Sequence, residues 1–374
     1  MPVQHTASGA GAPTSAPPSL SAHYLDTSTG DQYMAKGTTS VSDWVKVGGE
    51  TPITAATWLV SLPDSNRIQE IAPFAVSSSV KYIAWGGQKV YAGSSVDQLN
   101  EIHFGNGIAG MAVGNGVALF IDATEAILST SDGVSVSPVA TPPAISGLMV
   151  TGFVFREAEQ DFLLYAIDPQ TMTSSTYISA DGQTWADAAS SLSVPAGTIL
   201  QGMTFIPGAG LYYGILASTT GQEGWNGTSS DGLTWTAVAA DPAAVFFNTV
   251  AYCPASGRYV GMGALDGMPY YSDDGMLTFN PMPEQVSGIT VFLMGVQWVT
   301  DLGLFVAVSR MPTRWDGVLI VSRDGVQWEP VIVVRDINLG GSQSAPETIY
   351  WDAPRKVLAL GASSGVAYFA RVTA

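Results

Sequence analysis

The sequence predicts an all-β protein assembled from one repeated unit. Three observations support this expectation: a short phrase recurs five times, charged residues make up only 12% of the 374 residues, and glycine (41) and proline (22) are abundant. Short strands joined by tight turns are typical of such a composition, whereas amphipathic helices need a charged outer face. A nearly fixed period indicates a supersecondary unit that packs against copies of itself.

The repeated phrase has a serine or threonine two residues before an Asp-Gly pair and a large apolar residue within the four residues after it. The spacing between successive aspartates is 49, 50, 43 and 50 residues. Both residues of an Asp-Gly pair tolerate positive φ, and the aspartate oxygen can accept backbone N–H groups. We therefore expect a structural turn in each copy, with a metal-binding or catalytic role as the alternative. The aspartates concerned are Asp132, Asp181, Asp231, Asp274 and Asp324.

Each copy contains two strands joined by a turn, a variable loop, a third strand, the Asp-Gly turn and a fourth strand. The units can be followed from about residue 108 to the end of the chain, and a degenerate first unit covers about 80–104. Seven four-stranded sheets arranged radially make a β-propeller. Six blades, with an irregular first unit, are the alternative.

The last unit ends after three strands, at residues 368–372. A propeller must pair this blade with another strand, because an open sheet edge invites aggregation. Two segments ahead of the first unit could supply the missing strand, residues 44–47 and 58–62. We favour residues 57–61, because they lie closer to the first unit.

The first 50 residues differ in composition from the rest of the chain. Residues 1–20 are small, polar and rich in proline, so we expect an extended or disordered arm. Residues 21–50 predict a small β-hairpin attachment segment, with Tyr24 opposite Tyr33 across a Thr-Gly-Asp turn. Residues 51–374 are assigned to the propeller.

Charge and composition exclude several classes of function. The net charge of −17 repels phosphate backbones and anionic lipids, so we expect neither nucleic-acid binding nor membrane insertion. No signal-peptide pattern and no run of 18 apolar residues occurs. Cys253 is the single cysteine, which excludes an intramolecular disulfide. His5, His23 and His103 do not cluster, so we expect no metal site, no histidine triad and no cofactor.

The repeated phrase resembles the Asp-box repeat of sialidases and related propellers, whose pattern is Ser-x-Asp-x-Gly-x-Thr-Trp. This chain departs from the pattern because the aspartate and glycine are adjacent, as in Asp181-Gly182 and Asp231-Gly232. The shortened form resembles propeller repeats of phage virion proteins and bacterial surface proteins. The Pro-rich start, the two tyrosines of the hairpin and Trp44 resemble the attachment modules that begin phage tail or head fibre proteins.

These resemblances imply a structural protein of a phage virion, a component of a tail fibre, head fibre or tail tip. Residues 1–50 would attach it to other virion proteins, and the propeller would bind a glycan or protein of the host surface. A homo-oligomer in the assembled particle is also implied. We expect no enzymatic activity; a glycan-cleaving, sialidase-like propeller is the first alternative, and a purely structural decoration protein is the second.

The predicted binding surface is the rim opposite the Asp-Gly turns. In a four-stranded blade the first and third connections lie on one rim, so the variable second connections collect on the other. Two of these loops place a tryptophan beside polar or charged residues, which suits stacking on a sugar or anchoring a protein; alternatively, these tryptophans cover the core. The predicted binding residues are Trp225, Glu223, Trp315, Arg310, Arg314 and Asp168.

Overall fold

The computed structural model describes the chain except for residues 1–5, 20–21, 27–31, 49–54, 62–67, 69, 78, 97, 140–143, 189–191, 219–223, 239–246, 264–268, 283–284, 287–288, 291, 311–316, 335–345, 363–366 and 374. The chain divides into two compact units. The first contains Met1–Thr57 and Val372–Ala374, and the second contains Trp58–Arg371.

The N-terminal unit is a four-stranded sheet in the order β1-β2-β3-β4. The predicted hairpin is its centre, since Tyr24 in β2 pairs with Tyr33 in β3 and their ring centroids lie 6.2 Å apart. Part of the predicted arm is strand β1, which pairs in parallel with β2, so the arm is extended rather than disordered there. An isolated hairpin is marginally stable, and β1 and β4 satisfy the backbone groups on its two edges. The elements of this unit are β1 (Thr6–Gly9), β2 (His23–Asp26), β3 (Gln32–Ala35), the 3-10 turn η1 (Val41–Asp43) and β4 (Trp44–Gly48).

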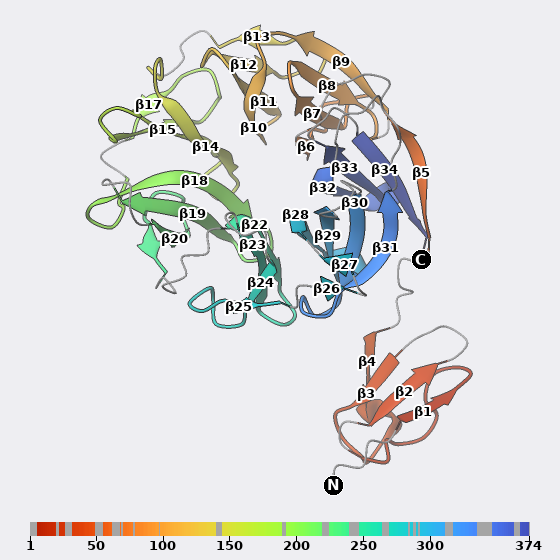
Figure 1. Ribbon diagram of the computed structural model, residues 1–374. Coiled ribbons are helices and arrows are strands. Elements are labelled where there is room, and N and C mark those ends of the chain that lie inside the picture. The colour runs from red at the N-terminus through yellow and green to blue at the C-terminus, as the bar shows by residue number, and fades with distance from the viewer. Residues whose placement is uncertain are drawn as a thin grey trace. The chain divides into compact units, whose positions relative to one another are not determined.

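The second unit is a β-propeller, as predicted from the repeats: four-stranded sheets stand around a common centre (Figure 1). Six of the sheets are each made of four consecutive strands. Their strands are β6 (Glu70–Pro73), β7 (Tyr82–Gly86), β8 (Lys89–Gly93), β9 (Leu99–Phe104); β10 (Ile108–Gly114), β11 (Val117–Asp122), β12 (Ile127–Thr130), β13 (Ser137–Pro138); β14 (Met149–Arg156), β15 (Asp161–Ile167), β16 (Ser174–Ser179), β17 (Ala186–Asp187); β18 (Thr198–Ile206), β19 (Leu211–Ser218), β20 (Gly224–Ser229), β21 (Thr236–Ala237); β22 (Phe247–Cys253), β23 (Arg258–Gly263), β24 (Pro269–Ser272), β25 (Asn280–Pro281); and β28 (Phe292–Val299), β29 (Leu304–Arg310), β30 (Gly317–Ser322), β31 (Glu329–Val334).

The last sheet closes the ring with a strand from the other end of the propeller. Its order is β32-β33-β34-β5, where β5 precedes every other propeller strand in the sequence. The prediction that residues 57–61 complete the last blade is thereby confirmed, since they lie within β5 (Ala55–Ser61). The other strands are β32 (Pro346–Asp352), β33 (Val357–Ala362) and β34 (Ala367–Thr373).

The first blade begins earlier than the predicted boundary near residue 80. Its inner strand is β6, which the sequence reading missed because the loop that joins it to β7 is longer than the tight turns of the other units. A short hairpin, β26 (Gln285–Val286) with β27 (Ile289–Thr290), lies in the chain between two blades. The remaining 3-10 turns are η3 (Thr300–Leu302) and η4 (Ala353–Arg355). Within the described part of the chain, no helix has the length and apolar character needed to cross a membrane.

The hydrophobic core lies between neighbouring blades. Leu119 of β11 packs in one cluster with Phe162 and Leu164 of β15, and all three side chains have no exposed surface. Val260 of β23 and Phe305 of β29 make the equivalent joint between two later blades. Each blade is therefore stabilised by its neighbours rather than by a core of its own.

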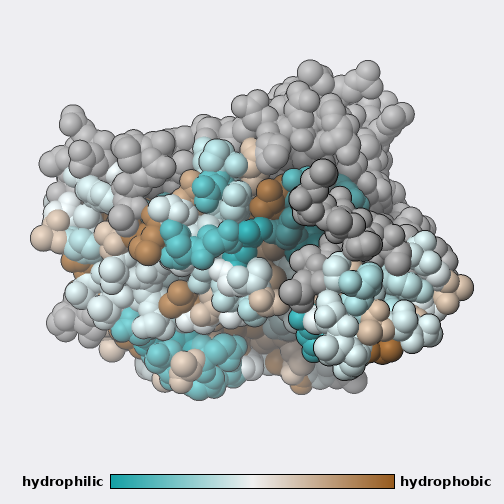
Figure 2. Space-filling model, turned by 90° about the horizontal axis from the view of Figure 1, so that it is seen from below, coloured by the Kyte–Doolittle hydropathy of each residue, from teal (hydrophilic) through white to brown (hydrophobic). Residues whose placement is uncertain are grey.

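Large exposed hydrophobic side chains are scattered over different elements. On the face in Figure 2 the coloured residues mix hydrophilic and hydrophobic types, and the hydrophobic ones do not gather into one broad patch. Single exposed apolar residues are normal on a folded protein. Those in the described part of the chain are Val41, Phe104, Val134, Met149, Phe205 and Leu277.

The Asp-Gly turns join the third and fourth strands of their blades. In one of them, Asp181 Oδ1 accepts the backbone N–H groups of Gln183 and Thr184, both at 2.8 Å, and Ser179 Oγ accepts the N–H of Gly182 at 2.8 Å. Gly182 has a φ of +71°, which residues other than glycine adopt rarely. The backbone N–H groups of Thr184 and Gln183 lower the pKa of Asp181 to about 2. These are the contacts of a structural turn.

One turn is longer by a residue. In it, Asp274 Oδ1 accepts the N–H of Thr278 at 3.0 Å, and the N–H bonded to Ser272 Oγ belongs to Met276 rather than to a glycine. Met276 has a φ of +69°, and its side chain has no exposed surface. Burial of this side chain in the joint between blades offsets the cost of the left-handed backbone.

Two arginines connect a blade to the Asp-Gly turn of the next blade. Arg156 donates from Nε and Nη2 to the carboxylate of Asp161, at 2.7 and 2.6 Å, and from Nη1 to the carbonyl oxygen of Asp231 at 2.8 Å. Arg258 repeats this pattern with the carboxylate of Asp273 and the carbonyl oxygen of Asp324. The two sites differ in exposure: 14% of the Asp161 side chain is exposed, against 50% of the Asp273 side chain.

Arg156→Met is expected to lower the free energy of unfolding by about 3 kcal/mol, because it leaves the shielded Asp161 carboxylate without its cation. Arg258→Met is the matched control at the exposed site, where the expected loss is about 1 kcal/mol or less. Urea unfolding followed by tryptophan fluorescence measures both. Equal losses of unfolding free energy at the two positions would show that shielding of the carboxylate from water does not set the strength of the ion pair.

Candidate functional site

The inner strands of six blades share a β-bulge at the same position. In each of these blades, five residue pairs follow the bulge before the turn that joins the inner strand to the second strand. At the bulge, one residue of the inner strand has no partner, so the register shifts by one residue. A bulge bends a strand and redirects the neighbouring side chains, and conserved geometry of this kind is frequent near binding sites. The residues skipped in the pairing are Ala109, Thr151, Gln201, Asn248, Met294 and Glu347.

The residue that follows each bulge is small. It is Gly110, Gly152, Gly202, Thr249, Gly295 or Thr348. In β6 the equivalent position is Glu70. The residue after it, Ile71, packs towards the preceding blade, as Met111, the residue after Gly110, does in β10. A carboxylate in the first blade thus stands where the other blades have glycine or threonine.

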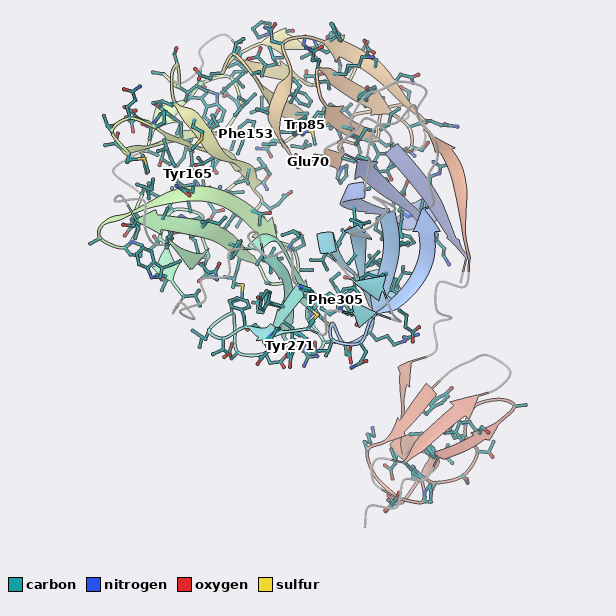
Figure 3. The ribbon with its side chains drawn as sticks, viewed as in Figure 1. Glu70, Trp85, Phe153, Tyr165, Tyr271 and Phe305 are labelled. Carbon is teal, nitrogen blue, oxygen red and sulfur yellow. The ribbon has the colours of Figure 1, made fainter. Side chains whose placement is uncertain are left out.

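A cavity of about 350 Å³ lies beside Glu70. Its walls come from β6, β7, β10, β11, β14 and β18, which belong to four consecutive blades. Figure 3 shows Glu70 at the inner edge of the ring, with Trp85 and Phe153 near it. The lining residues are Glu70, Trp85, Ala109, Gly110, Met111, Ile121, Val150, Thr151, Gly152, Phe153, Val154, Met203 and Thr204.

Gly110 leaves open space in this cavity. A Cβ atom added to Gly110 would meet no atom within 4 Å, whereas one added to Gly152 would meet Met203 Cβ at 3.2 Å. The walls are formed by a buried indole, a phenyl ring and two thioethers, from Trp85, Phe153, Met111 and Met203.

Glu70 has one hydrogen-bond donor in the cavity wall. Trp85 Nε1 donates to Glu70 Oε2 at 3.1 Å. The side chain of Glu70 is exposed. Protein atoms around its carboxyl group displace part of the water, which raises its pKa to about 7, although the hydrogen bond from Trp85 acts in the opposite sense. Near neutral pH the group can therefore be a neutral donor or a negative acceptor. Such a group can pair with a cation or transfer a proton.

Two of the six predicted binding residues have described side chains. Trp225 lies in β20 and pairs with Leu216, so its expected position in a loop is wrong. It is half-buried and packs on the cluster that contains Leu216 and Trp235, because the strand continues through the segment that was read as loop. Asp168 Oδ1 accepts the backbone N–H groups of Gln170, at 2.8 Å, and Thr171, at 3.2 Å, so it forms its own loop.

The structure describes less of the other four predicted binding residues. Arg310 is the last residue of β29 and pairs with Phe292 and Gly317 in the register of its sheet. Glu223, Arg314 and Trp315 lie outside the described residues. The described members of the predicted surface belong to separate blades and are engaged within them, whereas the cavity at Glu70 unites four blades.

Sequence reasoning missed Glu70 and the role of Trp85. The signal was present in the repeats: a glutamate where six other units have glycine or threonine. This difference becomes visible only when the units are aligned. The alignment needs the inner strand of the first unit, which the sequence pattern did not reveal. Within the described ranges, no three metal-binding side chains come together.

Comparison with known proteins supports the fold. No family model matches the chain, and no curated protein matches its sequence. A solved structure of YCF48 bound to a D1 peptide has a TM-score of 0.58 and 15% identity, and the match covers 85% of this chain and 97% of that one. YCF48 from Cyanidioschyzon merolae has a TM-score of 0.56 and 14% identity, with 84% of this chain and 98% of that chain covered.

A GH74 xyloglucanase from Xanthomonas campestris gives a TM-score of 0.55 at 14% identity, with 84% of this chain and 53% of that chain covered. At these identities the three likenesses show the propeller fold alone. One of these proteins is an enzyme and another is bound to a peptide, so the fold leaves the activity of this chain open.

Glu70→Gln is expected to raise the melting temperature at pH 8 and to change it little at pH 5. Because the pKa of Glu70 is raised from 4.5 to about 7, its contribution to stability is complete below pH 4.5 and is lost as pH rises through 7. Glutamine is neutral at every pH, so the variant does not lose this stability as pH rises. Differential scanning calorimetry at the two pH values measures the effect.

Glu157→Gln, in an exposed turn, is the control and should behave like the unchanged protein at both pH values. A melting temperature for Glu70→Gln that differs equally at pH 5 and pH 8 would show that ionisation of this carboxyl group is not the cause.

Proposed function

We propose that the protein is a non-enzymatic adhesion protein of a phage virion, part of a tail fibre, head fibre or tail tip. Its N-terminal unit attaches to other virion proteins, and its propeller binds a component of the host surface. The observation that carries the binding role is the cavity at Glu70, an accessible space lined by one carboxylate and two aromatic side chains.

The composition of this cavity favours binding over glycan cleavage. Glycosidases commonly use two carboxyl groups about 5–10 Å apart, one on each side of the scissile bond. Glu70 is the one acid among the described residues that line the cavity. An accessible cavity with one acid and two aromatic side chains is suited to holding a ligand.

Two further features support the attachment role. The N-terminal sheet is a compact unit separate from the propeller, as expected for a module with its own partner. The short Asp-Gly phrase resembles repeats of phage virion proteins and bacterial surface proteins, and the proline-rich start resembles that of phage fibre proteins. In the particle, residues 1–50 are expected to contact other virion proteins, and the chain to assemble with copies of itself.

A glycan-cleaving enzyme is the second candidate, and one observation favours it. A carboxyl group with a raised pKa beside an indole ring is the usual setting of a general acid. The structural likeness to a xyloglucanase is consistent with such a role and does not establish it.

Labelling with antibodies against the full chain separates these possibilities. The proposal expects label on the fibres or tail tip of the particles, and purified protein that binds host cells and slows adsorption of the particles. Label confined to fractions without particles would contradict it.

The enzymatic alternative is tested with host envelope polysaccharide. No reducing ends should be released by the full-length protein. Sugar release that disappears in Glu70→Gln and persists in Glu157→Gln would establish the enzyme instead.

A further inference from the structure

We propose that the cavity at Glu70 binds an ammonium group carried on an apolar stem, of the kind that ends a lysine side chain. The inference deepens the proposed function, since it names the ligand class of the same site. It selects a protein component of the target surface over a neutral glycan.

The first argument is the unused acceptor. Trp85 donates to Glu70 Oε2, while Oε1 has no hydrogen-bond partner in the described part of the chain. The side chain is exposed, so a ligand can reach this oxygen. A charged donor on a carboxylate gives a hydrogen bond about twice as strong as a neutral pair.

The second argument is the charge of the surroundings. No lysine, arginine or histidine is among the described residues that line the cavity, so a carboxylate or phosphate ligand would meet Glu70 without a compensating cation. The whole chain carries a net charge of −17, which attracts cations and repels anions. A cationic ligand is the complement of this site.

The third argument is the nature of the walls. Trp85 and Phe153 contribute aromatic rings to the lining, and the π face of such a ring attracts an ammonium group. Met111 and Met203 supply flexible thioethers, which adapt to an aliphatic stem.

The fourth argument is size and the small number of polar side chains in the described lining. A volume of about 350 Å³ is at the lower end for small-molecule sites, so it suits one side chain or a small amine. A sugar would need several hydrogen-bond partners, but Thr151 Oγ1 already donates to the carbonyl oxygen of Leu200 at 3.2 Å. Besides Glu70, that leaves Thr204 as the other polar side chain in the described lining.

Isothermal titration of the full-length protein with Nα-acetyl-lysine amide and with n-butylammonium tests the proposal. Nα-acetyl-norleucine amide and n-butanol are the matched probes that lack the charge. We expect the charged probes to bind and the uncharged ones to fail. Binding of the lysine probe points to a protein side chain as the source, whereas binding of n-butylammonium alone points to a free amine; both support the ammonium class.

Two variants examine the site itself. Glu70→Gln should weaken binding by about tenfold or more, the loss of one charge-assisted bond. Gly110→Val should block binding by filling the open space at that position, without touching Glu70. Melting temperatures confirm that both variants fold, and Glu157→Gln should bind like the unchanged protein.

The pH dependence gives an independent readout. No other ionisable side chain faces Glu70 from the described lining residues of β7, β10, β11, β14 or β18. Lysine-type amines stay charged below pH 10, so Glu70 is the one group of the described lining that titrates in this range. With its pKa at about 7, affinity should be about 30-fold lower at pH 5.5 than at pH 8.5.

Failure of both charged probes, equal binding of the uncharged probes, or full affinity in Glu70→Gln would overturn the proposal. These outcomes are separate from those of the particle labelling. If the protein binds ammonium probes but is absent from particles, the ligand proposal stands and the virion role is contradicted. If it is present on particles but binds no ammonium probe, the virion role stands and the ligand proposal is contradicted.

Discussion

Closure of the ring is the constraint on which the rest of the structure depends. Every blade buries its hydrophobic faces against two neighbours, so the first and last blades also need each other. The joint between them contains a buried hydrogen bond, in which the hydroxyl of Tyr82 donates to Asp352 Oδ1 at 2.9 Å. Pairing of β5 with β34 completes the last sheet at this joint. Without it, the first and last blades would each leave a hydrophobic face without its partner.

Much of the fold follows from local chemistry that is visible in the sequence. Asp-Gly pairs such as Asp181-Gly182 demand a left-handed glycine and a carboxylate that accepts backbone N–H groups, so their period marks the blades directly. The closing strand could also be inferred, because the last unit is one strand short. The N-terminal sheet was predicted only as a hairpin, since the pairing of β1 with β2 joins segments that have no shared pattern.

The candidate site was beyond the reach of the same reasoning. Glu70 is unusual only by comparison with glycine or threonine at equivalent positions of other blades, and the register that makes them equivalent depends on bulges that the sequence does not reveal. Trp225 was predicted to lie in a loop but lies in a strand. A tryptophan between polar residues suggested an exposed anchor, but tertiary packing placed it on the core cluster of its blade. The Asp-Gly pairs therefore predicted the turns, whereas the polar neighbours of Trp225 gave no sign that it lies in a strand.

The closing strand also has a consequence for biosynthesis. Strand β5 (Ala55–Ser61) leaves the ribosome before any blade is complete, yet its partner β34 (Ala367–Thr373) is made after every other strand of the propeller. Contacts between segments so far apart in sequence form slowly, because a long loop must close before they are gained. A nascent chain must therefore keep a strand unpaired while all the other blades assemble. Truncated products would expose two complementary edges, and exchange of β5 between two such chains offers them a route to a dimer.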